Sequence, residues 1–238
     1  GFVALAANDV VAQTNDAAAQ ELLAGASSEA PVYQQIKAKF IDGGVGFMAA
    51  VLLCLILGLA VAIERIIYLS LSTTNTSKLI AKVEDALNNG GVEAALEVCR
   101  NTRGPVASIF YQGLSRMDQG LEAVEKSVVS YGGVQAAQLE TGLTWLSLFI
   151  AMAPNLGFLG TVIGMIGAFD AIQAAGDISP IVVASGIKVA LITTVAGLIV
   201  ALILQVFFNY ITSKVESLVI TMEDASVSLI DILVKAKK

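Results

Sequence analysis

Three threonines carry hydroxyl groups into apolar stretches where such groups could do chemistry. Thr161 lies in APNLGFLGTVIGMIGAF, and Thr193 and Thr194 are neighbours in VALITTVAGLIVAL. A hydroxyl donates and accepts hydrogen bonds, so it can bind a dehydrating cation or pass a proton without adding a fixed charge. The alternative is that each hydroxyl only donates to the carbonyl four residues earlier in its own helix, and spacing alone favours this alternative.

Lys188 is the second candidate, because it is the one ionised residue of the charge-poor stretch 178–213. A lysine inside a membrane span costs about 2.5–3.5 kcal/mol unless it reaches the interface or a partner. It lies about 12 Å from the start of its predicted helix, so it can snorkel. If Thr161 and Thr194 share a depth, Asp170 and Lys188 differ by about 4.5 Å in depth, so an intramembrane ion pair is the second reading. Contact with a partner's carboxylate is the third.

The sequence gives little support for an enzymatic, metal-binding or nucleic-acid-binding function. The segment from Ser185 to Lys188 fits the S-x-x-K spacing of penicillin-binding enzymes, but the companion S-D-N and K-T-G motifs are missing. The chain has no histidine, and Cys54 and Cys99 fall in segments of different character, so we expect no disulfide, no metal site and no cofactor. The net charge of −6 and the absence of a basic block argue against nucleic-acid binding. We therefore predict that the protein is not an enzyme.

Composition predicts the elements that position these residues. Hydrophobic residues make up 56% of the 238 and charged residues only 14%, well below the charged fraction of soluble domains. The charge-poor stretches 43–63, 141–169 and 178–213 are each long enough for a membrane-spanning helix. We predict an all-α integral membrane protein, divided as follows: an N-terminal segment with an amphipathic helix (1–44), span one (45–71), a helical domain (72–140), span two (141–172), a loop (173–180), span three (181–210) and a C-terminal helix (211–238).

Basic residues set the predicted orientation. Seven Lys and Arg residues lie between spans one and two and four follow span three, whereas the loop 173–180 has none. The positive-inside tendency therefore places the middle domain and the C-terminus in the cytoplasm and the N-terminus outside. Glu64 and Arg65 form a predicted pair at the inner membrane boundary. Residues 1–12 are typical of the end of a signal peptide.

The middle domain is predicted to contain short helices that end near Gly90–Gly91, near Gly104–Pro105 and near Gly120. From Leu121 we expect one helix to run on into span two, with Gly132–Gly133 as its weak point, so that spans two and three both extend into the cytoplasm. The face of the C-terminal projection is predicted to consist of Ile211, Val215, Leu218, Met222, Ala225, Leu229 and Ile232.

Small residues recur every three or four positions in spans two and three, which predicts flat faces where helix backbones approach closely. The predicted packing glycines are Gly157, Gly160, Gly164, Gly186 and Gly197. Three helices enclose little by themselves, so a ring of copies is a natural use of these faces.

These segments together resemble the ExbB/TolQ/MotA family of ion-driven motor subunits, and the ExbB branch most closely. The similar segments are AIERIIYL, GGVEAALEVC, GPVASIFYQGL, APNLGFLGTVIGMIGAF and GIKVALITTVAGLIVAL, over residues 45–238. The resemblance implies a homopentamer in the bacterial inner membrane, with a periplasmic N-terminus and with two ExbD-like single-span subunits in its lumen. It also implies that proton or sodium flow energises a TonB-like protein for outer-membrane import.

The same resemblance assigns Thr161 and Thr194 to the ion pathway, with Thr193 beside them. Many relatives carry a glutamate where this chain has Val189, so the partner's aspartate and the threonines are left as the expected path, and sodium becomes an option. A TolQ- or MotA-like stator is the alternative function, and a non-conducting membrane scaffold is the third.

Overall fold

The computed structural model describes residues 34, 37, 39–41, 43–176 and 180–236, and the regular elements there are all helical. The predicted signal-peptide remnant and most of the N-terminal segment lie outside the described residues. The elements in chain order are α3 (Val45–Ser72), α4 (Thr76–Arg100), α5 (Pro105–Leu114), the 3₁₀ turn η1 (Met117–Gln119), α6 (Leu121–Glu140), α7 (Leu143–Ala175) and α8 (Pro180–Ala236).

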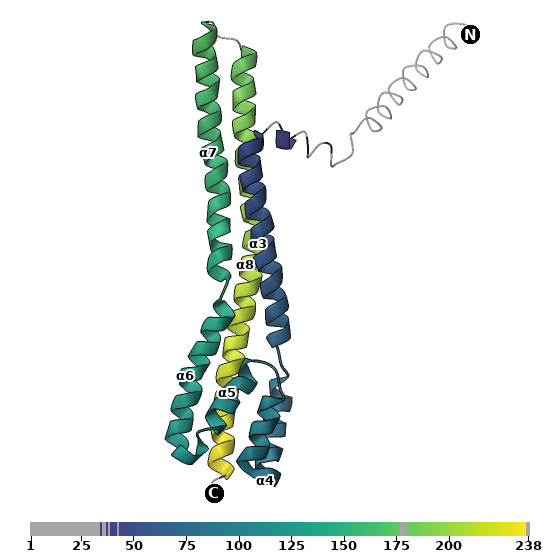
Figure 1. The fold of residues 1–238 in the computed structure, drawn as a ribbon, viewed down its shortest axis with the longest axis vertical. Helices are drawn as coiled ribbons and strands as arrows, with labels where there is room; N and C mark the ends of the chain where they lie inside the picture. Colours follow the sequence, from purple (N-terminus) through teal and green to yellow (C-terminus); the bar gives the residue numbers. More distant parts are fainter. Residues whose placement is uncertain (1–33, 35–36, 38, 42, 177–179, 237–238) are drawn as a thin grey trace, which may run out of the picture.

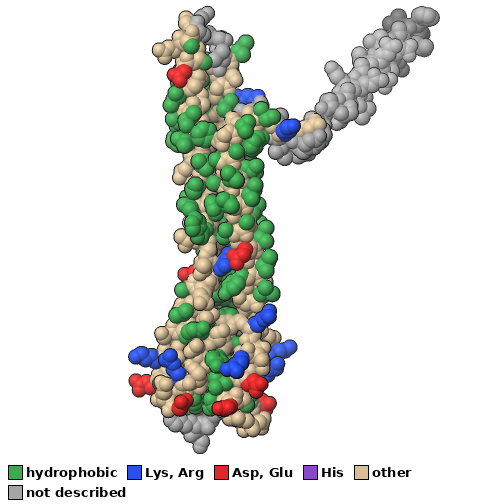
Figure 2. Space-filling view, viewed as in Figure 1, with side chains coloured by type: hydrophobic (Ala, Val, Ile, Leu, Met, Phe, Trp, Pro, Cys, Tyr) green, Lys and Arg blue, Asp and Glu red, His purple; other side chains and the backbone are tan. Residues whose placement is uncertain are grey.

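The upper part of the molecule is a bundle of α3, α7 and α8, and the lower part gathers α4, α5 and α6 around the end of α8 (Figure 1). Three helical stretches of the described chain are long and apolar enough to cross a membrane. Apolar side chains cover the shaft on the visible face, and charged side chains gather at the lower end (Figure 2). The predicted all-helical membrane architecture is therefore confirmed.

α8 is one continuous helix of 57 residues, about 86 Å long at 1.5 Å per residue. Its lower half buries the face that the sequence predicted, Ile211, Val215, Leu218, Met222, Ala225, Leu229 and Ile232, each at most 8% exposed. This face packs against α4, α5 and α6. One rigid element thus runs through the upper bundle and the lower domain.

The prediction that span two continues without interruption into the lower domain is wrong. Gly132 and Gly133 lie inside α6, and the chain instead breaks between α6 and α7, where Gly142 adopts φ 90°. A left-handed backbone favours glycine because glycine has no Cβ. Arg65 of α3 passes this point, since a Cβ on Gly142 would lie 3.2 Å from its Cδ atom. Within the described part of the chain, α8 alone therefore joins the two parts as an unbroken helix.

The lower domain follows the predicted division into short helices. α4 contains a break at Gly91, with φ 72° and ψ −166°, and Asn75 caps its start by accepting a hydrogen bond from the Lys78 N–H. Phe110 and Leu229 are fully buried in the core between α5 and α8. Burial raises the pKa of the Cys99 thiol from 9.0 to about 11, so this cysteine stays protonated at neutral pH.

Candidate functional site

Glycines bring α7 and α8 into close contact in the upper bundle. A Cβ on Gly197 would lie 2.5 Å from the Ala153 carbonyl oxygen, and one on Gly157 would lie 3.0 Å from the Thr193 carbonyl oxygen. Gly160, Gly164 and Gly186 also face the opposite helix. Because larger residues would push the backbones apart, these positions set the helix separation that the next contacts require.

The hydroxyls of Thr161 and Thr194 meet across this contact and are hydrogen-bonded to each other. Thr161 Oγ1 lies 3.1 Å from the Ala190 carbonyl oxygen of α8 and 3.2 Å from the Gly157 carbonyl oxygen of its own helix. Thr194 Oγ1 lies 3.3 Å from each of the same two carbonyl oxygens. The site is thus a cluster of four oxygens, two from each helix. We call the hydroxyls of Thr161 and Thr194 the hydroxyl pair, and the Gly157 and Ala190 oxygens are its two carbonyls.

Proton counting shows what this cluster can do. Each hydroxyl has one proton and can donate once, while a carbonyl only accepts. One threonine therefore donates to the other, and the second donates to a carbonyl. Rotation of both hydroxyls reverses the order without breaking a covalent bond, so the pair can carry a hydrogen-bond chain in either direction. The same four oxygens are uncharged ligands of the kind that a hard cation prefers.

Both threonines make the bond to their own helix that spacing favours, and both also reach across to the other helix. Each threonine does reach the carbonyl four residues earlier, Gly157 for Thr161 and Ala190 for Thr194. Each also reaches the carbonyl of the other helix and the other hydroxyl. The sequence analysis did not name the Gly157 and Ala190 carbonyl oxygens as partners of the threonine hydroxyls, although the rule that threonine bonds the carbonyl four residues earlier identifies both of them.

Thr193 lies apart from the hydroxyl pair. Its side chain is 1% exposed, and its hydroxyl is 2.6 Å from the Gly43 carbonyl oxygen and 2.9 Å from the Val189 carbonyl oxygen. Neighbouring residues on an α-helix point about 100° apart, so the Thr193 hydroxyl faces the chain just before α3 while the Thr194 hydroxyl faces α7. A part for Thr193 in an ion pathway stays a prediction, and Gly43 is a partner that the sequence did not identify.

Glu64 and Arg65 form the predicted pair, with Arg65 Nε 2.5 Å and Nη2 2.8 Å from the two carboxylate oxygens of Glu64. The Arg65 side chain is only 14% exposed, and its guanidinium lies 4.9 Å from the centre of the Tyr68 ring. It also lies against Gly142, as described above. The pair therefore links the C-terminal half of α3 to the break between α6 and α7.

Asp170 and Lys188 both have exposed side chains, Asp170 near the C-terminal end of α7 and Lys188 near the N-terminal end of α8. The salt bridge within 4 Å that joins described residues is the one between Glu64 and Arg65. An ion pair between Asp170 and Lys188 thus stays a prediction. Among the described residues no cluster of three or more Cys, Asp or Glu side chains could hold a metal ion.

A sequence model of the MotA/TolQ/ExbB proton channel family matches residues 101–224, which include both members of the hydroxyl pair. The chain belongs to the MotA/TolQ/ExbB proton channel family. A proton channel family consists of transport proteins, so the prediction that the chain is not an enzyme agrees with this membership.

Several curated relatives carry ExbB names. A protein of Methanothermobacter thermautotrophicus named as a homolog of the biopolymer transport protein ExbB is 35% identical over 162 residues, or 68% of this chain and 57% of that protein. A Synechocystis protein named ExbB-like 1 is 31% identical over 179 residues, or 74% of this chain and 70% of its own length. Biopolymer transport protein exbB1 of Vibrio cholerae is 46% identical over 68 residues, or 28% of this chain and 30% of that protein. These relatives bear out the resemblance to the ExbB branch of the family.

Proposed function

We propose that this protein is the ring-forming subunit of an ExbB–ExbD type motor in the bacterial inner membrane. In this proposal five copies surround the single transmembrane helices of ExbD-like subunits, and the complex uses the proton or sodium motive force to energise a TonB-like protein for outer-membrane import. The N-terminus is periplasmic, the C-terminus is cytoplasmic, and lipid covers the outer face. The observation that carries the proposal is the hydroxyl pair between α7 and α8, inside the region that matches the family.

The ion step follows from the geometry of the pair. A protonated carboxyl group on an ExbD-like helix that approaches the pair can give its proton to one hydroxyl and become a carboxylate, while the second hydroxyl releases a proton to water on the other side. The pair is charge-neutral before and after this exchange, so it imposes no charged state of its own on the apolar surroundings. Val189 is half-buried and offers no carboxylate, so the acidic group must come from the partner.

α8 supplies the mechanical part of the proposal. Its 57 residues form one helix that contacts α3 and α7 above and α4, α5 and α6 below. A displacement at Thr194 therefore reaches the lower domain through an uninterrupted hydrogen-bonded rod. α6 and α7 are separated at Gly142 and cannot transmit torque in the same way.

The test is ion flux through the chain co-reconstituted with an ExbD-like partner in proteoliposomes. Thr161→Val and Thr194→Val keep the volume and remove one hydroxyl, so each is expected to lower flux at least 10-fold, while Thr161→Ser retains most of it. Thr144→Val is the matched control, because Thr144 lies on the same helix with an exposed side chain outside the pair.

Comparing sodium with sodium-free buffer across pH identifies the ion. Proton transfer predicts flux without sodium, whereas cation binding by the four oxygens predicts flux that saturates with sodium. An absence of flux under either gradient, with the complex assembled, would favour the non-conducting scaffold. Flux that responds to Thr144→Val as strongly as to Thr194→Val would also contradict the proposed site.

A further inference from the structure

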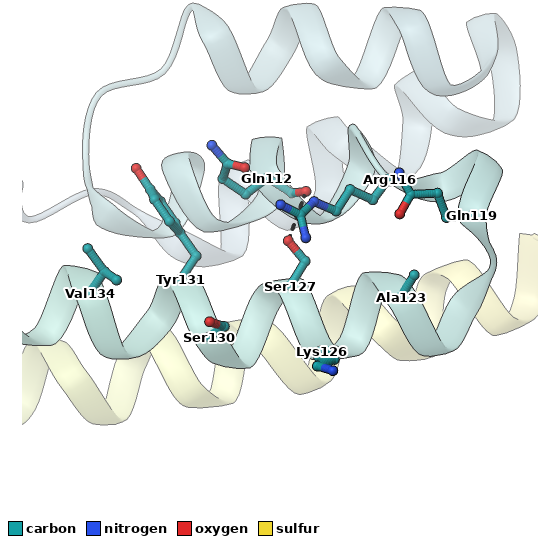
Figure 3. Close-up of a pocket in the computed structure, with 9 residues that line it drawn as sticks. All are labelled: Gln112, Arg116, Gln119, Ala123, Lys126, Ser127, Ser130, Tyr131 and Val134. Carbon is teal, nitrogen blue, oxygen red and sulfur yellow. Dashed lines mark hydrogen bonds between the residues drawn. The ribbon is translucent and has the colours of Figure 1, made fainter.

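The lower domain contains an open cavity of about 370 Å³ between α5, η1 and α6, which we name the α5–α6 pocket (Figure 3). Its lining includes two cationic side chains, two carboxamides and three hydroxyl groups, but no carboxylate. The cations are Arg116 and Lys126, and the hydroxyls belong to Ser127, Ser130 and Tyr131. Cavities of roughly 300–1,000 Å³ with a few convergent polar groups are the usual form of small-ligand sites.

Among the residues that the structure describes, the two cations form no salt bridge. Neither Arg116 nor Lys126 has an Asp or Glu oxygen within 4 Å among the described residues. Glu122 and Glu125 line a separate depression that shares Lys126 with the pocket, so the lysine lies between the two. Arg116 lines only the α5–α6 pocket and not the neighbouring depression. Figure 3 shows its side chain reaching back along α5 toward Ser127. Arg116 is therefore the principal cation of the pocket.

Ser127 gives the pocket a built floor. Its side chain is only 5% exposed, and its hydroxyl donates to the Gln112 carbonyl oxygen across a long 3.4 Å (Figure 3). This bond is near the outer limit of hydrogen-bond geometry, so the hydroxyl is weakly held and can turn to a stronger acceptor. A buried donor beside an uncompensated guanidinium is a favourable arrangement for an oxyanion.

The depth of the pocket bears on where its ligand comes from. Ser127 lies thirteen residues before Glu140, where α6 ends next to Gly142, or about 20 Å along that helix. Gly142 contacts Arg65, at the end of the apolar part of α3. The pocket thus lies well away from the apolar part of α3.

From the unpaired guanidinium, the lysine and the buried hydroxyl we infer that the α5–α6 pocket binds the phosphate group of a small anionic ligand. Arg116 holds two phosphate oxygens through its planar fork, Lys126 adds a point charge, and Ser127 donates from below. Binding at this place connects α5 and α6, two of the three elements on which the lower part of α8 packs.

The experiment uses the full chain in phosphatidylcholine nanodiscs and titrates sodium pyrophosphate by calorimetry at constant ionic strength. We expect saturable binding at one site per chain. Arg116→Gln is expected to weaken it about 10- to 100-fold and Ser127→Ala about 2- to 10-fold, while Arg116→Lys keeps part of the affinity. Arg103→Gln is the matched control, because Arg103 is an exposed arginine that does not line the pocket.

A second arm separates a soluble source from a lipid source. Native mass spectrometry of the wild type and of Arg116→Gln in phosphatidylglycerol measures lipid retention. Pyrophosphate binding that depends on Arg116, with unchanged lipid retention, supports a soluble phosphate ligand. Lipid retention that depends on Arg116 supports the phosphate site with a headgroup as its source. If neither probe depends on Arg116, or if Arg103→Gln weakens binding equally, the inference is overturned.

Discussion

Substituting Gly197 with alanine would test whether the separation of α7 and α8 controls the hydroxyl pair. The new Cβ would stand 2.5 Å from the Ala153 carbonyl oxygen, where ordinary contact begins near 3.4 Å. The obstacle is a backbone atom, which cannot rotate away, so α8 must move by about 0.9 Å at this level. Thr194 lies one helical turn away and moves with it. The 3.1 Å distance from Thr161 Oγ1 to the Ala190 carbonyl would then approach about 4 Å and the bond would be lost.

The expected cost of this overpacking is about 1–3 kcal/mol of unfolding free energy. For a chain of this size each kcal/mol lowers Tm by about 2–4 °C. In Gly197→Ala, both the Tm measured in nanodiscs and the ion flux measured with the ExbD-like partner should be lower than in wild type. The matched control is Gly167→Ala, because a Cβ on Gly167 of α7 meets nothing within 4 Å. Equal Tm and equal flux in the two variants would refute the claim that helix separation controls the site.

Three further results are expected. The first concerns Cys99: above pH 9 its thiol ionises in the unfolded chain, while in the folded chain it holds its proton up to about pH 11. The free energy of unfolding, measured by chemical denaturation, should therefore fall between pH 9 and about pH 11 in wild type and fall less in Cys99→Ala. Asn75→Ala should cost about 1 kcal/mol by removing the cap of α4, whereas Asn75→Asp, which keeps an accepting oxygen, should cost less; equal losses would contradict the capping role. Lys188→Met should leave assembly and flux unchanged if the lysine only snorkels, and loss of either would support a functional contact in the membrane.

Much of the fold could be predicted because periodicity and burial are local properties of the sequence. The seven apolar positions between Ile211 and Ile232 recur at helical spacing, and burial of that face follows from the hydrophobic effect. The break at Gly91 follows from paired glycines after a polar turn. The break before span two could not be located in the same way, because Gly132–Gly133 and Gly142 are equally able to leave a helix.

The sequence alone determined that the chain is an all-helical membrane protein with hydroxyls at Thr161 and Thr194, because composition and side-chain type are independent of partners. Tertiary structure decided which neighbours those groups meet. It joined the two hydroxyls across α7 and α8, turned Thr193 toward Gly43, and placed the helix break at Gly142, where Arg65 passes. The physical reason is that hydrogen-bond partners and backbone breaks depend on the separation and rotation of helices, and these are set by long-range packing rather than by local sequence.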